Sequence, residues 1–231
     1  MNAPLTREDV KTQAGRKRAM RDLMLRDHGW VRKLYDNTHE IAPGVWRSFQ
    51  PSPAALKKWA DKGIKTVINL RGDKPSAYLF LEQEACEALG LNLVTLRLFS
   101  REAPAPDTLH KAQMLFRSLR YPVLFHCKSG ADRAGLMATL YLFLHEGKPL
   151  DEALQQLSFR YGHVRQGKTG VIDRAFDLYM DHAKQHGISL RDTDAFFAWI
   201  DSDAYDPVSI KREFLSTWWG NLLTERLLRR E

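Results

Sequence analysis

Residues that could carry out covalent chemistry are concentrated in one segment, 126–135, which reads HCKSGADRAG. The segment begins at the end of an apolar stretch, 121–126, and runs into the start of another, 133–145. This pattern predicts a loop between a strand and a helix. Backbone N–H groups and the dipole at a helix N-terminus favour an anion. The same field stabilises a thiolate, so the sequence predicts that Cys127 is a nucleophile facing a phosphate-binding loop.

The other residues of this segment suit a phosphoryl group. Arg133 can offer its planar fork of donors to two phosphoryl oxygens, a geometry that Lys cannot reproduce. Gly130 lets the backbone turn without a Cβ that would obstruct the anion. We expect Cys127 to attack phosphorus in line and water to cleave the phosphocysteine afterwards. The predicted phosphate-binding residues are Lys128, Ser129, Gly130, Ala131, Asp132 and Arg133.

The elements around this loop alternate between strands and helices. Strands are predicted at 45–49, 65–70, 92–98 and 121–126, and helices at 53–62, 77–89, 107–120 and 133–145. This alternation predicts an α/β fold with a mainly parallel sheet of four to five strands flanked by helices. Beyond it the chain is predicted to be helical, at 151–160, 171–186, 192–201 and 208–229.

The segment resembles the signature of the cysteine-dependent protein tyrosine and dual-specificity phosphatases, His-Cys-x5-Arg. His126, Cys127, Gly130 and Arg133 match at the right spacing, between a predicted strand and a predicted helix. The stretches 46–51 and 67–71 resemble the opening strands of small bacterial and fungal members, and the resemblance covers about residues 40–185. It implies a metal-independent phosphatase without a cofactor. A rhodanese-type sulfurtransferase and a catalytically weak module that binds phosphorylated ligands are the alternatives.

The chain departs from the family pattern directly after the arginine. Most relatives have Ser or Thr there, whose hydroxyl supports the thiolate leaving group, whereas this chain has Ala134. Breakdown of the phosphoenzyme is then slow, or Ser129 substitutes. Lys128 and the Ser129-Gly130 pair resemble tensin-type lipid phosphatases, and Asp132 before the arginine resembles myotubularins. The substrate therefore stays open among phosphoproteins, phosphoinositides, inositol phosphates and lipid or sugar phosphates.

The general acid has two candidates. The stretch 99–107 has the length and prolines of an acid-bearing loop, but Asp107 also suits the N-cap of the next helix. Asp132 lies inside the phosphate-binding loop and either donates the proton or braces the loop by bonding backbone amides. We favour Asp132.

Four further residues are predicted to support the site. His126 orients the loop through hydrogen bonds. Arg71 follows a strand at the carboxyl edge of the sheet, where open α/β proteins bind ligands, although it and Asn69 also suit a buried structural bond. Arg101 could contact a further phosphate. Gln166 falls where the family positions its hydrolytic water, unless it belongs to a solvated turn.

Charge indicates how the rest of the chain is organised. Residues 1–35 carry nine basic and four acidic side chains, and residues 207–231 carry five basic and three acidic ones. These two ends account for the whole net charge of +7, so the middle of the chain is neutral. A nucleic-acid-binding core is therefore not expected. We predict a basic N-terminal arm or helix at 1–38, in which residues 5–28 suit a mostly exposed helix or a partly ordered arm. A catalytic domain is predicted at 39–186 and a helical extension at 187–231.

Two further expectations concern location and packing. No segment approaches the roughly 20 apolar residues of a membrane span, so we expect a soluble protein. The two cysteines suit free thiols, so we expect the protein in a reducing cytoplasm. Its basic ends could contact the inner membrane surface. The stripe Ile210, Phe214, Trp218 and Leu222 suits packing against protein better than against lipid. Cys86 is predicted to be a core thiol.

Overall fold

The computed structural model describes residues 5–30 and 36–228, with side chains up to residue 218. Contacts within the chain divide it into two compact units. The first comprises Met1–Arg97 and Ser118–Ala134, and the second comprises Leu98–Arg117 and Gly135–Glu231. The whole loop 126–133 belongs to the first unit.

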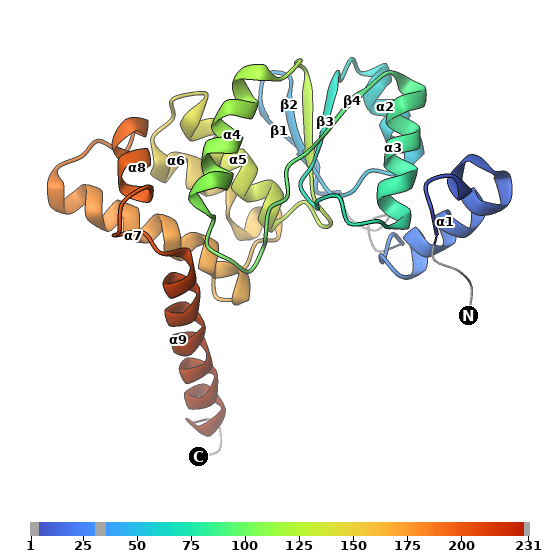
Figure 1. Ribbon diagram of the computed structural model, residues 1–231. Coiled ribbons are helices and arrows are strands. Elements are labelled where there is room, and N and C mark those ends of the chain that lie inside the picture. The colour runs from blue at the N-terminus through green and yellow to red at the C-terminus, as the bar shows by residue number, and fades with distance from the viewer. Residues whose placement is uncertain (1–4, 31–35, 229–231) are drawn as a thin grey trace. The chain divides into compact units, whose positions relative to one another are not determined.

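A five-stranded sheet forms the centre of the first unit (Figure 1). Its order is β1-β2-β5-β3-β4, and every neighbouring pair is parallel except β1 and β2. The α/β class and the mainly parallel sheet of four to five strands are thus confirmed. The sequence analysis missed β1, a four-residue edge strand without a buried face. The strands are β1 His39–Ala42, β2 Val45–Ser48, β3 Thr66–Asn69, β4 Asn92–Thr95 and β5 Val123–His126.

The register of the sheet brings three strand ends to one level. Ser48 at the end of β2 and Asn69 at the end of β3 are both partners of His126 at the end of β5. Because these strands are parallel, the segments that leave them emerge at the same edge of the sheet. The loop that begins at Cys127 is therefore bordered by the segments that follow β2 and β3.

Helices α2 (Pro53–Asp61) and α3 (Ala77–Leu89) lie side by side against this sheet (Figure 1). Pro53 is the first residue of α2, and the hydroxyl of Ser52 caps that helix by accepting the N–H of Ala55. Leu56, Ile64 and other buried side chains join both helices to β3 and β5 in one apolar cluster. Its buried members are Leu56, Trp59, Ile64, Val67, Ala85, Cys86, Leu91 and Leu124.

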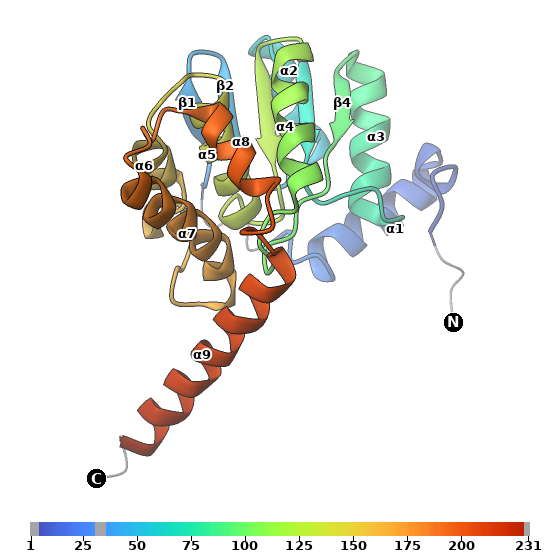
Figure 2. The same cartoon turned by 60° about the vertical axis from the view of Figure 1, so that its left-hand side comes forward.

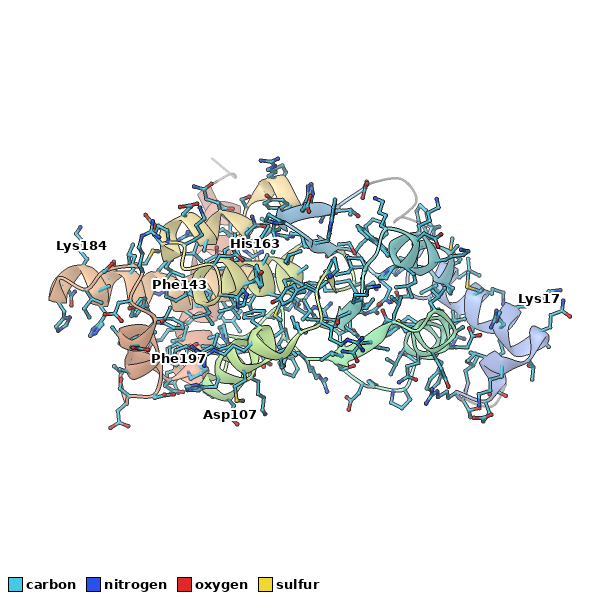
Figure 3. The ribbon with its side chains drawn as sticks, turned by 90° about the horizontal axis from the view of Figure 1, so that it is seen from above. Lys17, Asp107, Phe143, His163, Lys184 and Phe197 are labelled. Atoms are coloured by element: carbon cyan, nitrogen blue, oxygen red, sulfur yellow. The ribbon has the colours of Figure 1, made fainter. Side chains whose placement is uncertain are left out.

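The N-terminal segment forms the 3-10 helix η1 (Asp9–Lys11) and the helix α1 (Gln13–Leu25). Ala19 and Leu23 of α1 are buried against Ala77 and Leu81 of α3. The rest of α1 is largely solvent-exposed, and Lys17 points away from the protein (Figure 3). The prediction of a mostly exposed helix is therefore right, and one narrow face anchors it.

The second unit is helical and has an aromatic core. Phe143 of α5 packs edge-on against Phe196 of α8, which also contacts Tyr179 of α7. Phe143 and Phe197, the neighbour of Phe196, are labelled in Figure 3. Helix α5 begins in the first unit at Asp132. The helices are α4 Pro106–Ser118, α5 Asp132–Leu144, α6 Leu150–Ala153, α7 Val171–His186, α8 Thr193–Ile200 and α9 Pro207–Leu228.

The continuous helix predicted at 151–160 is wrong. Helix α6 ends at Ala153 and is followed by the 3-10 helices η3 (Leu154–Gln156) and η4 (Phe159–Tyr161). Leu157 and Ser158 between them have non-helical backbone conformations. The apolar spacing alone did not reveal this interruption.

The first half of α9 packs on its own unit, as expected (Figure 2). Ile210 is buried, and Trp218 donates its indole N–H to the carbonyl oxygen of Gln166 at 2.9 Å. Leu222, the last member of the predicted stripe, lies beyond the described side chains. None of the helices in the described ranges is long and apolar enough to cross a membrane.

We predict that Cys86 resists alkylation in the folded protein. Cys86 is 1% exposed, and burial, with a smaller contribution from the charge of Glu82, raises the pKa of its thiol from 9.0 to about 12. At pH 8 only about one thiol in ten thousand would be ionised, and the thiolate is the reactive form. Mass spectrometry after iodoacetamide treatment at pH 8 should find Cys86 unmodified natively and modified in urea. Equal labelling rates in both states would contradict this packing.

Candidate active site

Cys127 follows β5 directly and lies at the base of a tight loop. Its side chain is almost completely buried, and its backbone N–H donates to the carbonyl oxygen of Ser48 at 3.4 Å. Three residues later, the N–H of Gly130 donates to Cys127 Sγ at 3.3 Å. The loop therefore folds back over the sulfur and directs an amide hydrogen at it.

Four consecutive carbonyl groups of this loop accept hydrogen bonds from donors outside it. The donors come from the strand β2, from the residue two positions after it and from the segment before β1. Each carbonyl is thereby held away from the interior of the loop. The bonds are Gln50 N to Lys128 O at 3.4 Å, Asn37 Nδ2 to Ser129 O at 3.0 Å, and Arg47 Nη2 to Gly130 O at 2.7 Å and to Ala131 O at 2.9 Å.

The direction of these carbonyls determines the direction of the amides. In a trans peptide the N–H points opposite to the C=O of the same unit. With the carbonyls of residues 128–131 turned outward, the N–H groups of residues 129–132 turn toward the side on which Gly130 meets the sulfur. The loop thus presents a set of amide donors around Cys127, as an anion requires.

Arg47 is the main support of this arrangement, and the sequence analysis missed it. Its side chain is fully buried in β2, although arginine is rarely buried without partners. One guanidinium nitrogen bonds both Gly130 O and Ala131 O. The only signal in the sequence was a charged residue in a strand that is otherwise buried.

Asn37 is a second support that the sequence analysis did not find. It is 6% exposed, and its amide nitrogen reaches Ser129 O. His39 Nε2 lies 3.1 Å from the amide oxygen of Asn37 and fixes which end of the amide faces the loop. No feature of the local sequence distinguishes this asparagine from a turn residue.

Gly130 is required by both conformation and space. Its φ angle is +78°, in the left-handed region that favours glycine. A Cβ at this position would meet the backbone nitrogen of Phe49 at 2.8 Å and the carbonyl carbon of Ser48 at 2.9 Å. The loop can therefore press against the end of β2 only with glycine at this position.

A buried polar group lies behind His126. Glu82 of α3 is 1% exposed, and its Oε1 lies 2.6 Å from His126 Nε2 and accepts a hydrogen bond from Gln50 Nε2 at 3.1 Å. The structure places the His126 ring against Glu82, and its predicted role in orienting the loop stays a prediction. Glu82 was missed as a site residue, although an acid on the buried face of a helix is unusual.

Arg71 and Lys128 meet one acidic residue from the N-terminal segment. Arg71 donates to both carboxylate oxygens of Asp27, at 2.9 and 2.6 Å, and Lys128 Nζ lies 3.5 Å from Oδ1. Asn69 accepts the backbone N–H of Arg71 and donates to Gly72 O. Asn69 is thus a structural turn residue, while Arg71 combines a structural contact with a position at the site.

The start of α5 carries three further residues of the segment. Asp132 and Arg133 are half-buried and open the helix, and Ala134 is fully buried. Within the described part of the chain, the side chain of Arg133 has no hydrogen-bond or ion-pair partner. The predicted loop between β5 and the start of α5 is thus present, and the anion-binding and catalytic roles of its residues stay predictions.

Three predicted residues belong to the second compact unit. Asp107 is exposed in the first turn of α4, where Figure 3 labels it, and Arg101 is exposed in the preceding turn. Gln166 is also exposed, and its backbone oxygen accepts the indole N–H of Trp218. Their predicted functional roles are not tested by these positions.

Comparison with known proteins relates the chain to phosphatases. The family model described as "DSP-PTPase phosphatase fused to NAD+ Kinase" matches residues 29–171, more than half of the chain. The dual specificity protein phosphatase TpbA of Pseudomonas aeruginosa is 28% identical over 121 residues, which is 52% of this chain and 53% of TpbA. The probable NAD kinase 2 of Oryza sativa subsp. japonica is 25% identical over 56% of this chain and 14% of its own length.

Solved structures with a similar chain path include two phosphatases. TpbA in complex with pTyr matches 59% of this chain and 82% of its own, at 19% identity and a TM-score of 0.46. Tk-PTP in its active form matches 58% of this chain and 90% of its own, at 22% identity and a TM-score of 0.47. This chain spans about half of the length of the curated phosphatase that it matches.

We predict that Gly130→Ala disrupts the loop, whereas Gly63→Ala does not. Both glycines have positive φ, so both substitutions cost about 1–2 kcal/mol in backbone strain. Only the Cβ at residue 130 meets backbone atoms, since the space around Gly63 is open. That clash should add about 1–3 kcal/mol.

Urea unfolding and inorganic phosphate binding measure the two consequences. Gly130→Ala should lose more stability than Gly63→Ala and should lose phosphate binding, while Gly63→Ala keeps it. Equal destabilisation of the two variants with phosphate binding retained would show that the loop does not need this close approach.

Proposed function

Because the chain belongs to the family of DSP-PTPase phosphatases fused to NAD+ kinase, we propose that it hydrolyses phosphomonoesters through a phosphocysteine intermediate. The observation that carries the proposal is the loop 127–131, whose carbonyls are bonded outward around the buried sulfur of Cys127. The segment lies inside the range that the family model matches. A ring of amides with a sulfur at its base suits a phosphoryl group better than a neutral ligand.

The first step transfers the phosphoryl group to sulfur. The Cys127 thiolate forms a bond to phosphorus while the bond from phosphorus to the ester oxygen breaks. The amides of residues 129–132 stabilise the charge on the equatorial oxygens, and Arg133 supplies its bidentate donors at the rim. The departing oxygen takes a proton from a carboxylic acid, for which we propose Asp132.

The second step releases phosphate and restores the thiolate. Water attacks the phosphorus of the phosphocysteine, the carboxylate that lost its proton accepts one from the water, and the bond between sulfur and phosphorus breaks. Ala134 offers no hydroxyl to the departing sulfur. Ser129 is the hydroxyl within the loop, and its Oγ accepts the N–H of Ala131 at 3.4 Å. We propose that Ser129 takes the supporting role.

We predict that Cys127→Ser abolishes hydrolysis of an aryl phosphate, because the serine hydroxyl is a far weaker nucleophile. The expected loss in kcat is on the order of a thousand-fold or more. Cys86→Ala is the matched control and should keep most activity, since Cys86 packs in the apolar cluster. A vanadate-sensitive assay with p-nitrophenyl phosphate and with phosphotyrosine, which TpbA binds in its crystal structure, measures both variants.

Two outcomes would contradict the proposal. Full activity in Cys127→Ser would exclude the phosphocysteine. Tight binding of phosphate esters by the wild type with no turnover would instead support a binding module, and cyanide-dependent thiocyanate production without hydrolysis would support a sulfurtransferase.

We predict that Asp132→Asn slows poor leaving groups more than good ones. An aryl oxide of low basicity departs without a proton, whereas an alkyl oxide needs one, so the loss should reach about a hundred-fold or more only for alkyl phosphates. Comparing kcat for p-nitrophenyl phosphate and a serine phosphate ester measures the difference. An equal loss for both esters would indicate that Asp132 braces the loop, and Asp107→Asn tests the alternative acid in the same assay.

A further inference from the structure

Two cations lie at the same edge of the sheet, beside the loop. Arg71 is two residues beyond Asn69, and Lys128 is two residues beyond His126. Asn69 and His126 are partners in the parallel pair β3 and β5, and the backbone N–H of Leu70 donates to His126 O. Lys128 is also the residue directly after Cys127 in the chain, so both cations come from segments that border the loop.

One carboxylate is held by both cations. Arg71 binds Asp27 with two parallel bonds, from Nη1 to Oδ2 at 2.9 Å and from Nη2 to Oδ1 at 2.6 Å. Lys128 Nζ approaches the same Oδ1 at 3.5 Å. The side chains of Arg71 and Asp27 are 8% and 14% exposed, whereas Lys128 is 42% exposed. The carboxylate is therefore bound much as a substrate anion would be.

The guanidinium of Arg71 is fixed independently of Asp27. Its Cζ lies 3.4 Å from the ring centroid of Tyr78, and its Nη1 also donates to Gln50 Oε1 at 3.0 Å. Gln50 in turn bonds Glu82. A guanidinium held in this way keeps its fork in place, and that fork fits phosphate oxygens as well as carboxylate oxygens.

Asp27 reaches this position from the end of α1. Its backbone N–H donates to Asp22 O at 3.2 Å, and α1 is anchored on α3 through Ala19 and Leu23. The anchor of α1 and the contact of Asp27 with the cations rest on separate interactions. The carboxylate could therefore leave the cations without undocking the helix.

We propose that Arg71 and Lys128 form a second anion-binding site beside Cys127, that Asp27 occupies it in the absence of substrate, and that a second phosphate group of the substrate displaces Asp27. The inference deepens the proposed function and rests on it, because the first phosphate would bind in the loop. It assigns the substrate to phosphate esters that carry another phosphate. Exchange of the carboxylate for a phosphate keeps both cations paired and replaces one negative charge with nearly two.

Asp27 also sets the affinity of this site. A ligand that can bind only after Asp27 has left has a higher apparent Kd. This apparent Kd is the intrinsic Kd divided by the fraction of molecules in which the cations are accessible. Removing the charge of Asp27 should therefore tighten binding of a doubly phosphorylated ligand and change binding of a singly phosphorylated one much less.

The test measures binding without turnover, by calorimetry in the Cys127→Ser background. The probes are myo-inositol 1-phosphate, the 1,4- and 4,5-bisphosphates of myo-inositol and inorganic phosphate. The readout is the ratio of the affinity for the better bisphosphate to that for the monophosphate. Asp27→Asn should raise this ratio about five-fold or more, the factor expected if the cations are accessible a fifth of the time or less.

Two further variants make the result specific. Asp22→Asn is the matched control, because Asp22 lies on α1 shortly before Asp27 and pairs with Arg26 rather than with the two cations. It should leave the ratio within two-fold. Lys128→Gln should lower the ratio, because it weakens binding of the bisphosphate more than binding of the monophosphate. Thermal unfolding of each variant checks that it is folded.

Three outcomes would overturn the proposal. The first is that no variant binds a bisphosphate, and the second is that the affinity ratio is unchanged in Asp27→Asn. The third is that the affinities for the monophosphate and for inorganic phosphate rise as much as the affinity for the bisphosphate, which would show only a general effect of charge. The proposed function fails separately, through aryl phosphate hydrolysis that does not depend on Cys127. A raised affinity ratio in a protein that hydrolyses no phosphate ester would support the second anion-binding site and contradict the proposed enzymatic activity.

Discussion

The hydrogen bonds to the outward carbonyls of residues 128–131 are the constraint on which the rest of the site depends. A peptide loop without outside contacts does not favour a conformation in which several successive amides face one side, because each N–H can bond to water or to a neighbouring carbonyl. Donors outside the loop impose that arrangement here. The amides are then already oriented before the proposed ligand, a phosphoryl group, arrives, so its binding would need no reorganisation of the backbone.

Burial of the donor groups is unfavourable by itself, and their hydrogen bonds to the loop carbonyls compensate for it. A guanidinium such as that of Arg47 loses several kcal/mol of hydration when it leaves water, and it is stable inside the protein only with strong acceptors. Two loop carbonyls serve as those acceptors. Glu82 Oε1 and His126 Nε2 form another close contact between buried polar groups, at 2.6 Å. The loop and the buried polar residues therefore stabilise each other, and loss of either side leaves buried groups without partners.

Local signals predicted the fold and the loop, and long-range contacts account for what was missed. Pro51, Gly63 and Gly90 mark the ends of strands and helices, so the alternation of these elements could be predicted from the sequence. The short edge strand β1 could not be predicted in this way. The spacing from Cys127 to Arg133 indicated the loop. Asn37 and Arg47 bond backbone atoms 92 and 83 residues away, and no local pattern reveals such a partner.

The same reasoning explains why Arg71 was only partly understood. Its position after β3 predicted a place at the carboxyl edge of the sheet, which the structure confirms. Its partner, Asp27, lies 44 residues earlier, on a segment that reads as a solvated basic helix. One of four acidic residues in a basic segment carries no signal of its own, and its contact with Arg71 forms only when α1 is packed on α3.

A crystal structure of the wild-type protein with tungstate tests the central claim most directly. The account predicts the metal of the oxyanion directly above Cys127 Sγ, with its oxygens within hydrogen-bond distance of the backbone nitrogens of residues 129–132 and of the Arg133 guanidinium. Tungstate bound elsewhere, or a loop whose amides turn away from the sulfur in its presence, would contradict the account.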